Sequence, residues 1–242
     1  MPARPSQTAH EAASIQTYAR AAGVLFLVSL IAGGFGEAYV PNRILVAGDA
    51  AATAANLTSL DSLLRWGFVG YLFEGMADVG LAWLFYVLLR PVNRNLALLA
   101  AFFGLVGTAV FAGLEVLSAG VPMVLGNAGY LASFSPEQRN ALAMLALRQY
   151  GHAAMLFTAF YGVGWIIRGY LIYRSEYLPR FLGVLLAIGG LGFALRNFAL
   201  ALTPQLPSGY LLFLLVPGGV ILMGWLLFKG VDVARWEAKA TP

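Results

Sequence analysis

Long apolar runs separated by short polar segments make up most of this chain. A helix needs roughly 20 apolar residues to cross a hydrocarbon core of about 30 Å, and it satisfies its backbone hydrogen bonds within one segment. Each run is long enough for such a helix, so the pattern predicts an all-α protein with six transmembrane helices. The predicted spans cover about residues 18–40, 62–89, 96–120, 140–172, 181–203 and 209–229.

The composition places the chain among integral membrane proteins. Hydrophobic residues make up 60% and charged residues 11% of its 242 residues, against roughly one half and one quarter in soluble domains. The formal net charge of +4 reflects where Lys and Arg flank the runs, so it gives no reason to expect a nucleic-acid partner. The chain has no cysteine, which excludes disulfides, zinc thiolate sites and cysteine nucleophiles.

Basic residues between the runs predict the orientation, because cytoplasmic loops carry an excess of Lys and Arg. They gather before the first span and after the second, fourth and sixth spans: Arg20, Arg90, Arg94, Arg168, Arg174, Arg180, Lys229, Arg235 and Lys239. We therefore expect a polytopic membrane protein, with cytoplasmic tails at residues 1–17 and 230–242 and one helical bundle domain over residues 1–242. A cleaved signal peptide is the alternative for the first run, whose most apolar part, residues 21–32, is short enough for one.

Local signals predict where two helices begin outside the membrane. Asp49 precedes an alanine-rich stretch, so it is expected to cap a short outer helix. The sequence SPEQ at residues 135–138 has the pattern of a capping box, which starts the helix of the fourth span at its proline. Asp61 and Arg65 lie four residues apart at the outer start of the second span, where an ordinary surface ion pair is expected.

Ionisable side chains inside the runs are the informative polar residues. A charge at bilayer depth costs from about 2.5 kcal/mol to more than about 10 kcal/mol, so these side chains are not expected to face lipid. At helical spacing, Glu74 and Asp78 share one stripe, and Arg148 and His152 share another. We predict one polar cluster inside the bundle, reachable from outside, as a site for a small ligand or a proton. Its members are Glu37, Glu74, Asp78, Glu115, Arg148, His152 and Arg196.

The charges of this cluster do not balance. Four carboxylates stand against two arginines, and burial beside like charges favours the protonated form of a carboxyl group. At least one acid is therefore expected to carry a proton or to hold a cation, and Asp78, the deepest acid, is the one we predict. The alternative is that the charged residues only hold the helices in register, as buried ion pairs often do.

Several chemistries lack the residues that they need. His152 is the single histidine within a predicted span, since His10 belongs to the N-terminal tail, so bis-histidine haem and three-histidine zinc sites are excluded. The sequence has no G-x-S-x-G, H-E-x-x-H or Walker motif. No catalytic residue, metal ligand or cofactor is therefore predicted, and an intramembrane enzyme would depend on the carboxylates and His152 alone.

Segments along nearly the whole chain resemble one family. They are YARAAGVLFLVSLIAGGFGEAYV, GDAAATAANL, YVLLRPVNRNLALLAAFFGLVGTAV, FSPEQRNALAMLALR, GYLIYRSEYLPRFLGVLL and GWLLFKGV. In these segments the chain is similar to the bacterial multi-pass membrane proteins grouped as domain-of-unknown-function family 4386. The resemblance implies a bacterial cytoplasmic-membrane protein with one domain, and it implies no activity.

Two classes of function remain open from the sequence. The first is a non-catalytic membrane protein, a sensor or accessory component, whose polar cavity binds a small ligand or a proton. The second is a carrier that moves a small solute or cation with a proton. Alternating access usually draws on more spans and on broken helices, so six continuous helices favour the first class. The lipid bilayer is the expected partner, and a homo-oligomer stays open.

Overall fold

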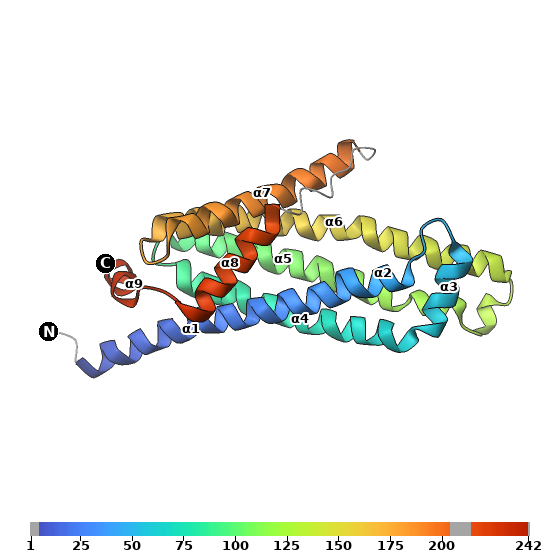
Figure 1. Ribbon diagram of the computed structural model, residues 1–242, viewed down its shortest axis with the longest axis horizontal. Helices are drawn as coiled ribbons and strands as arrows, with labels where there is room; N and C mark the ends of the chain where they lie inside the picture. The colour runs from blue at the N-terminus through green and yellow to red at the C-terminus, as the bar shows by residue number, and fades with distance from the viewer. Residues whose placement is uncertain (1–4, 204–213, 242) are drawn as a thin grey trace. The chain divides into compact units, whose positions relative to one another are not determined.

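The computed structural model describes residues 5–203 and 214–241. Every regular element in these ranges is helical (Figure 1), which confirms the all-α prediction for the described residues. The α-helices are α1 (Pro5–Gly33), α2 (Val40–Ile44), α3 (Ala50–Ser59), α4 (Asp61–Leu89), α5 (Arg94–Ala119), α6 (Pro136–Ser175), α7 (Arg180–Leu202), α8 (Leu215–Phe228) and α9 (Val233–Ala240). A π-helix η1 (Gly34–Tyr39) joins α1 to α2, and two 3-10 helices, η2 (Val121–Leu125) and η3 (Gly129–Leu131), follow α5.

Several of these helices are long and apolar enough to cross a membrane. Among the described residues there are four: Ile15–Ile44, Asp61–Leu89, Arg94–Leu125 and Arg180–Leu202. A fifth is added if α8 and α9, which meet at a bend of 98°, count as one span. The length and apolar composition of these helices suggest a multi-pass membrane protein. The number of six spans and the side on which the termini lie stay predictions.

Both predicted helix starts are confirmed. The Asp49 side chain accepts a hydrogen bond from the backbone N–H of Ala52, at 2.9 Å, and α3 follows directly. At the start of α6 the backbone N–H of Ser135 donates to Gln138 Oε1 at 2.8 Å, and Ser135 Oγ accepts from the backbone N–H of Gln138 at 3.3 Å. The reciprocal pair satisfies two backbone donors, as a capping box does, and fixes Pro136 as the first helical residue.

The chain folds into two compact units, and each is described by itself. Unit 1 comprises Met1–Leu27, Ala77–Thr108 and Thr158–Pro242, and unit 2 comprises Val28–Met76 and Ala109–Phe157. The helices α1, α4, α5 and α6 each contribute one segment to either unit. The ends of these helices therefore belong to different local environments, which matters for the acids placed along them.

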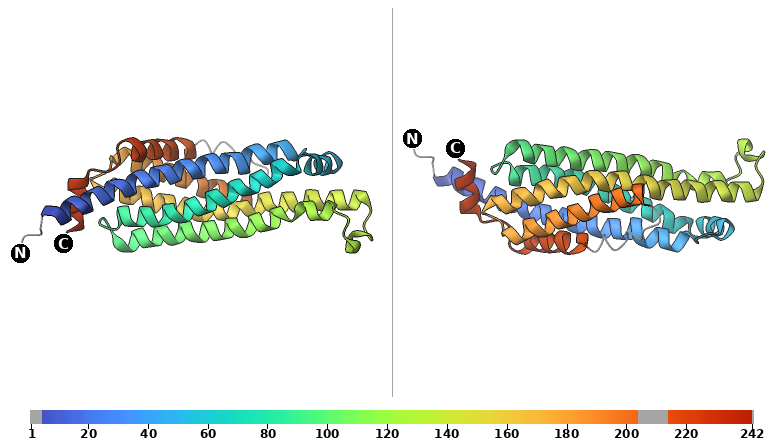
Figure 2. Two further views of the ribbon diagram at one scale, coloured as in Figure 1. Left: turned by 90° about the horizontal axis from the view of Figure 1, so that it is seen from below. Right: turned by 90° about the horizontal axis from the view of Figure 1, so that it is seen from above.

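Close helix contacts through glycine hold unit 1 together. A Cβ on Gly169 of α6 would lie 2.6 Å from the carbonyl oxygen of Gly183 of α7, and a Cβ on Gly23 of α1 would lie 2.7 Å from the backbone nitrogen of Leu227 of α8. Helix α8 packs beside α7, as Figure 2 shows. Lipid gives apolar helices no hydrophobic reason to associate, so close backbone approach at small residues supplies much of the packing.

Unit 2 has a separate apolar core, built from short outer elements and the start of α6. Its buried members are Val40, Ile44, Leu57, Val121 and Ala143. The buried Thr53 of α3 accepts a hydrogen bond from the backbone N–H of Val46 at 3.0 Å and donates to the carbonyl of Asp49 at 2.8 Å. The outer helix α3 is therefore a packed part of this unit.

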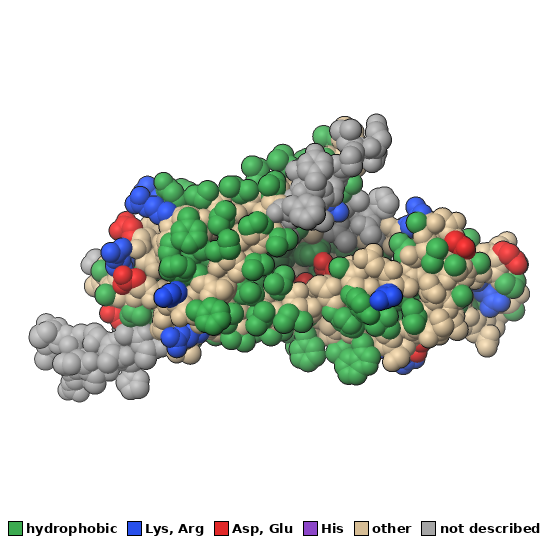
Figure 3. All heavy atoms as spheres, viewed as in Figure 1, with side chains coloured by type: hydrophobic (Ala, Val, Ile, Leu, Met, Phe, Trp, Pro, Cys, Tyr) green, Lys and Arg blue, Asp and Glu red, His purple; other side chains and the backbone are tan. Residues whose placement is uncertain are grey.

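Large apolar side chains also lie on the surface. Hydrophobic side chains cover much of the face seen in Figure 3. Leu202 at the end of α7 is 77% exposed, and Phe198 one turn earlier is 66% exposed. Exposed apolar surface on this scale is unfavourable in water and expected against lipid, so the surface agrees with the apolar length of the helices.

Candidate functional site

Asp78 and Tyr161 form the centre of a buried polar cluster in unit 1. Asp78, on α4, is only 6% exposed and accepts a hydrogen bond from the Tyr161 hydroxyl, on α6. The Tyr161 hydroxyl lies 3.1 Å from Oγ1 of Thr108, on α5, and Thr108 donates to the carbonyl of Gly104 at 3.0 Å. Three helices thus meet in one chain of hydrogen bonds that begins at the carboxylate and ends at a backbone carbonyl.

Arg168 is the cation of this cluster. It follows Tyr161 by seven residues on α6, which places both side chains on one face of the helix. Its side chain is 6% exposed, lies in electrostatic range of Asp78 and Tyr161, and holds its guanidinium 5.2 Å from the ring centroid of Phe85. Within the described residues, Arg168 Nε has no hydrogen-bond partner. The cluster therefore contains a buried donor without a hydrogen-bond partner among the described residues.

Gly104 makes room for that arginine. A Cβ at this position of α5 would lie 2.7 Å from Arg168 Nη2. A larger residue would push the guanidinium out of its position between α4 and α5. From the sequence, Arg168 belongs to the basic residues that predict orientation and not to the predicted cluster, so its charge near Asp78 was not predicted.

Glu115 and Tyr150 form the corresponding pair in unit 2. Glu115, on α5, is 3% exposed and accepts a hydrogen bond from the Tyr150 hydroxyl, on α6. Ser118, one turn further along α5, also donates to Glu115, at 3.3 Å. As with Asp78, a neutral tyrosine hydroxyl is the donor to the buried carboxylate.

Tyr71 joins the other acids of unit 2 to this pair. Its hydroxyl donates to the carbonyl of Gly36 in η1 at 2.7 Å, and its ring lies edge-on to Phe111. The same hydroxyl is close to Tyr150 and in electrostatic range of three acids: Glu115, Glu37 and Glu74. Three of the four predicted acids are thus gathered around one tyrosine, although Glu37 itself is exposed.

Glu74 is accommodated by a glycine of the first helix. The carboxylate is buried on α4, and a Cβ on Gly33 of α1 would lie 2.6 Å from Glu74 Oε1. Glu74 and Asp78 are one turn apart on α4, yet Glu74 belongs to unit 2 and Asp78 to unit 1. Each acid has its own set of neighbours.

The predicted basic residues lie in different surroundings. Arg148, on α6, is exposed, and its membership of the cluster stays a prediction. Arg196, on α7, is half-buried and makes no ion pair with any described residue. Its neighbour Asn197 donates to Thr158 Oγ1 at 2.9 Å, which links α7 to α6. The side chain of His152 lies outside the described residues.

Neither the ion pairs nor the acid groupings of the described residues mark a metal site. Three ion pairs between described residues lie near the surface: Arg65–Asp61 at 2.8 Å, Arg235–Asp232 at 3.3 Å and Lys239–Glu176 at 3.1 Å. The first confirms the pair expected at the start of the second span. Within the same part of the chain, no three His, Cys, Asp or Glu side chains are grouped so that they could hold a metal ion.

Tyrosine, threonine and one arginine are the residues that the sequence analysis missed. Tyr161, Tyr150 and Arg168 all lie on α6, and the two tyrosines donate to acids on α4 and α5. Tyrosines in an aromatic-rich membrane chain carry little signal, because most serve packing or the interface. The spacing of seven between Tyr161 and Arg168 was the one available indication.

A comparison with known families identifies the family of this chain. The family model described as Domain of unknown function (DUF4386) matches residues 21–230. The chain is also 25% identical, over 177 residues, to an uncharacterized protein of Archaeoglobus fulgidus, an alignment that covers 73% of this chain and 90% of that protein. No solved structure matches the chain. Since the family model spans most of the sequence, the chain belongs to the family Domain of unknown function (DUF4386).

Proposed function

We propose that this protein is a non-catalytic proton-binding membrane protein, a sensor or accessory component, in which Asp78 takes up and releases the proton. The observation that supports this role is the hydrogen-bond chain from Asp78 through Tyr161 and Thr108 to the carbonyl of Gly104. Its two central groups are hydroxyls, and each hydroxyl can both donate and accept. Such a chain tolerates either protonation state of the carboxyl group.

The two states differ in the direction of donation. With Asp78 ionised, Tyr161 donates to the carboxylate, and Thr108 can donate to Tyr161 or to the carbonyl of Gly104. With Asp78 protonated, the carboxyl donates to Tyr161, Tyr161 donates to Thr108, and Thr108 donates to Gly104. In both states each hydroxyl has an acceptor to which it can donate, so neither state leaves a hydroxyl of this chain of hydrogen bonds unsatisfied. An unsatisfied buried hydroxyl would cost about 1–3 kcal/mol.

Arg168 supports the second candidate, a proton-coupled carrier of a small solute. The guanidinium of Arg168 is buried in electrostatic range of Asp78, and its Nε has no hydrogen-bond partner among the described residues. This donor offers a contact to an acceptor group on a ligand. In this reading, proton uptake at Asp78 and ligand contact at Arg168 occur in one cluster and affect each other.

A topology of six spans with both termini in the cytoplasm belongs to the same proposal. Gln16 of α1 donates to the carbonyl of Lys229 at 3.0 Å and accepts from the backbone N–H of Val231 at 3.1 Å. These bonds join the beginning of the first span to the end of the last, which favours termini on one side and an even number of crossings. Helix α6, with 40 residues, supplies the sixth crossing beside the five candidates named above.

Infrared difference spectroscopy between about pH 6 and about pH 9 tests the proton site in purified protein. We expect a protonated carboxyl band that is lost in Asp78→Asn and shifted in Tyr161→Phe, because the tyrosine contacts that group. Asp61→Asn, a surface acid on the same helix, is the control and should leave the band unchanged. A band that survives in Asp78→Asn would assign the proton to another group and refute the proposal.

A further inference from the structure

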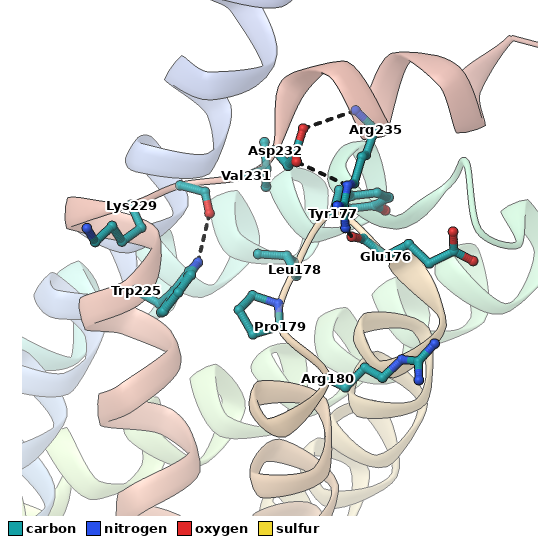
Figure 4. A pocket seen from close by; sticks show the side chains of 11 residues that line it. Glu176, Tyr177, Leu178, Pro179, Arg180, Trp225, Lys229, Val231, Asp232 and Arg235 are labelled. Atoms are coloured by element: carbon teal, nitrogen blue, oxygen red, sulfur yellow. Dashed lines mark hydrogen bonds and ion pairs between the residues drawn. The ribbon is translucent and has the colours of Figure 1, made fainter.

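A pocket of about 920 Å³ lies in unit 1, where the loop between α6 and α7 meets the bend between α8 and α9 (Figure 4). Pro179 and Arg180, at the start of α7, form one side, and Trp225 and Lys229, at the end of α8, form the opposite side. Helix α7 is a candidate span that begins here, and the predicted sixth span, residues 209–229, ends here. The pocket is therefore expected at the boundary between lipid and water.

Three cationic and two anionic side chains line this pocket: Arg180, Lys229, Arg235, Glu176 and Asp232. Both acids are engaged by basic residues of α9. Asp232 pairs with Arg235 at 3.3 Å, and Glu176 pairs with Lys239 at 3.1 Å. Arg235 also donates to the backbone carbonyl of Glu176 at 3.2 Å, which fixes α9 against the loop. Arg235 of α9 thus lines the pocket, and Arg235 and Lys239 of this helix pair with its two acids.

Arg180 and Lys229 retain charge for a ligand. Both side chains are exposed, and neither forms an ion pair with a described residue. Arg180 lies in electrostatic range of Glu176 and places its guanidinium 5.6 Å from the ring centroid of Tyr173. Stacking on a ring occupies the face of a guanidinium and leaves its N–H donors at the edge available to an anion.

Two exposed phenylalanines are sequence neighbours of residues that line the pocket, Phe181 of Arg180 and Phe228 of Lys229. Phe228 is 81% exposed, and Phe181 is about half exposed and packs edge-on against Trp225, with ring centroids 6.0 Å apart. Exposed aromatic rings at the ends of membrane helices are typical of the interface. A ligand in this place can therefore combine an anionic head with a hydrocarbon tail.

We propose that this pocket binds a phosphate-bearing anion, the headgroup of an anionic phospholipid, with Arg180 at one side of the site and Lys229 at the opposite side. The guanidinium supplies a planar pair of donors and the ammonium a compact charge, the two groups that proteins use for phosphate. The acyl chains of the lipid lie along Phe181 and Phe228. Basic pockets between membrane helices recognise headgroups in this way. The site is independent of proton binding at Asp78.

Thermal unfolding of the purified full chain in a neutral detergent distinguishes the sources of the phosphate. The probes, added separately, are a short-chain phosphatidylglycerol, the phosphatidylcholine of equal chain length, and inorganic phosphate. Phosphatidylglycerol is expected to raise the unfolding temperature at concentrations where the other two have no effect, since a ligand that binds the native state stabilises it. Equal protection by inorganic phosphate would identify a free anion as the ligand, and equal protection by phosphatidylcholine would show that charge is not recognised; either result overturns the proposal.

A pair of double variants tests the residues. Arg180→Gln with Lys229→Gln should raise the half-saturating concentration of phosphatidylglycerol at least about tenfold, and co-purified anionic lipid should disappear from native mass spectra. Arg90→Gln with Arg94→Gln removes the same charge from exposed positions between α4 and α5, and should change that concentration less than about twofold. An equal loss in both variants would mean general surface attraction and would refute the pocket.

Discussion

The Tyr161 hydroxyl on α6 donates a hydrogen bond to the Asp78 carboxylate on α4, across a separation of 83 residues in the chain. The pair joins two helices at a buried position of unit 1, with Thr108 of α5 as the next group. A buried carboxylate held by a neutral hydroxyl differs from one locked in an ion pair, because the hydroxyl can reverse its direction of donation when the acid gains a proton.

Tyr161→Phe removes the donor and keeps the ring. We expect a loss of about 1–3 kcal/mol in the free energy of unfolding, because a buried polar group loses its partner. Tyr170→Phe, at an exposed position of the same helix, is the control and should have little effect. Denaturant titration in detergent measures both. Asp78→Asn combined with Tyr161→Phe completes a double-mutant cycle, and additive effects would contradict a direct interaction.

Local features of this fold could be predicted because they depend on neighbouring residues. The Asp49 cap and the Asp61–Arg65 pair each involve positions three or four apart, and both are as expected. The apolar runs likewise identified the long helices. Sequence spacing is sufficient for such features, since the helix itself fixes which side chains meet.

The partners of the buried acids could not be predicted in the same way. Spacing shows that Glu74 and Asp78 share a face, but not which residue of another helix that face meets. The choice among arginine, tyrosine and histidine partners is made by helix packing, and here glycines such as Gly104 decide it by making room for Arg168. The charge count from the sequence set the buried acids against two arginines, Arg148 and Arg196, whereas the described contacts of Asp78 and Glu115 include tyrosine hydroxyls.

Gly169→Ala tests the close contact of α6 with α7. The new methyl group would lie 2.6 Å from the carbonyl oxygen of Gly183 and 2.8 Å from the backbone nitrogen of Ala187, so the helices must separate. We expect a loss of about 1–3 kcal/mol, the usual range for overpacking. Gly224→Ala on α8 is the control, since nothing lies within 4 Å of its added Cβ; it should be neutral or stabilising by up to about 1 kcal/mol. Equal unfolding temperatures for the two variants would disprove the contact.

The topology is checked by reporter fusions. Fusions after Arg94, Gln138, Arg180 and Pro242 should report inside, outside, inside and inside, because the basic residues gather at the first, third and last of these positions. If the first three fusions report as expected and the C-terminal fusion reports outside, the number of spans is not six. The two termini would then lie on opposite sides, contrary to the arrangement that the hydrogen bonds of Gln16 favour.

Acidification should loosen α9. The hydrogen bond and the charge of Lys239 hold the pKa of Glu176 below its ordinary value, in a loop outside the membrane. A carboxyl group whose pKa is lowered in the folded state stabilises that state at any pH above its unfolded-state pKa of about 4.3. This stabilisation is lost as the pH falls through the folded-state pKa. The effect is modest, since Glu176 is exposed and solvent screens the pair. Hydrogen exchange of the α9 amides, corrected for the intrinsic rate, should therefore accelerate below about pH 4.

Glu176→Gln supplies the comparison for that measurement. The variant cannot ionise, so its α9 amides should exchange faster than those of the wild type at neutral pH and should show no further acceleration on acidification. Glu137→Gln is the control, because the pKa of Glu137 is also lowered, by the Ser135 hydroxyl, but at the start of α6 and away from α9. Acid acceleration that persists in Glu176→Gln would assign the release of α9 to another group, with Asp232, which caps this helix, as the next acid to substitute.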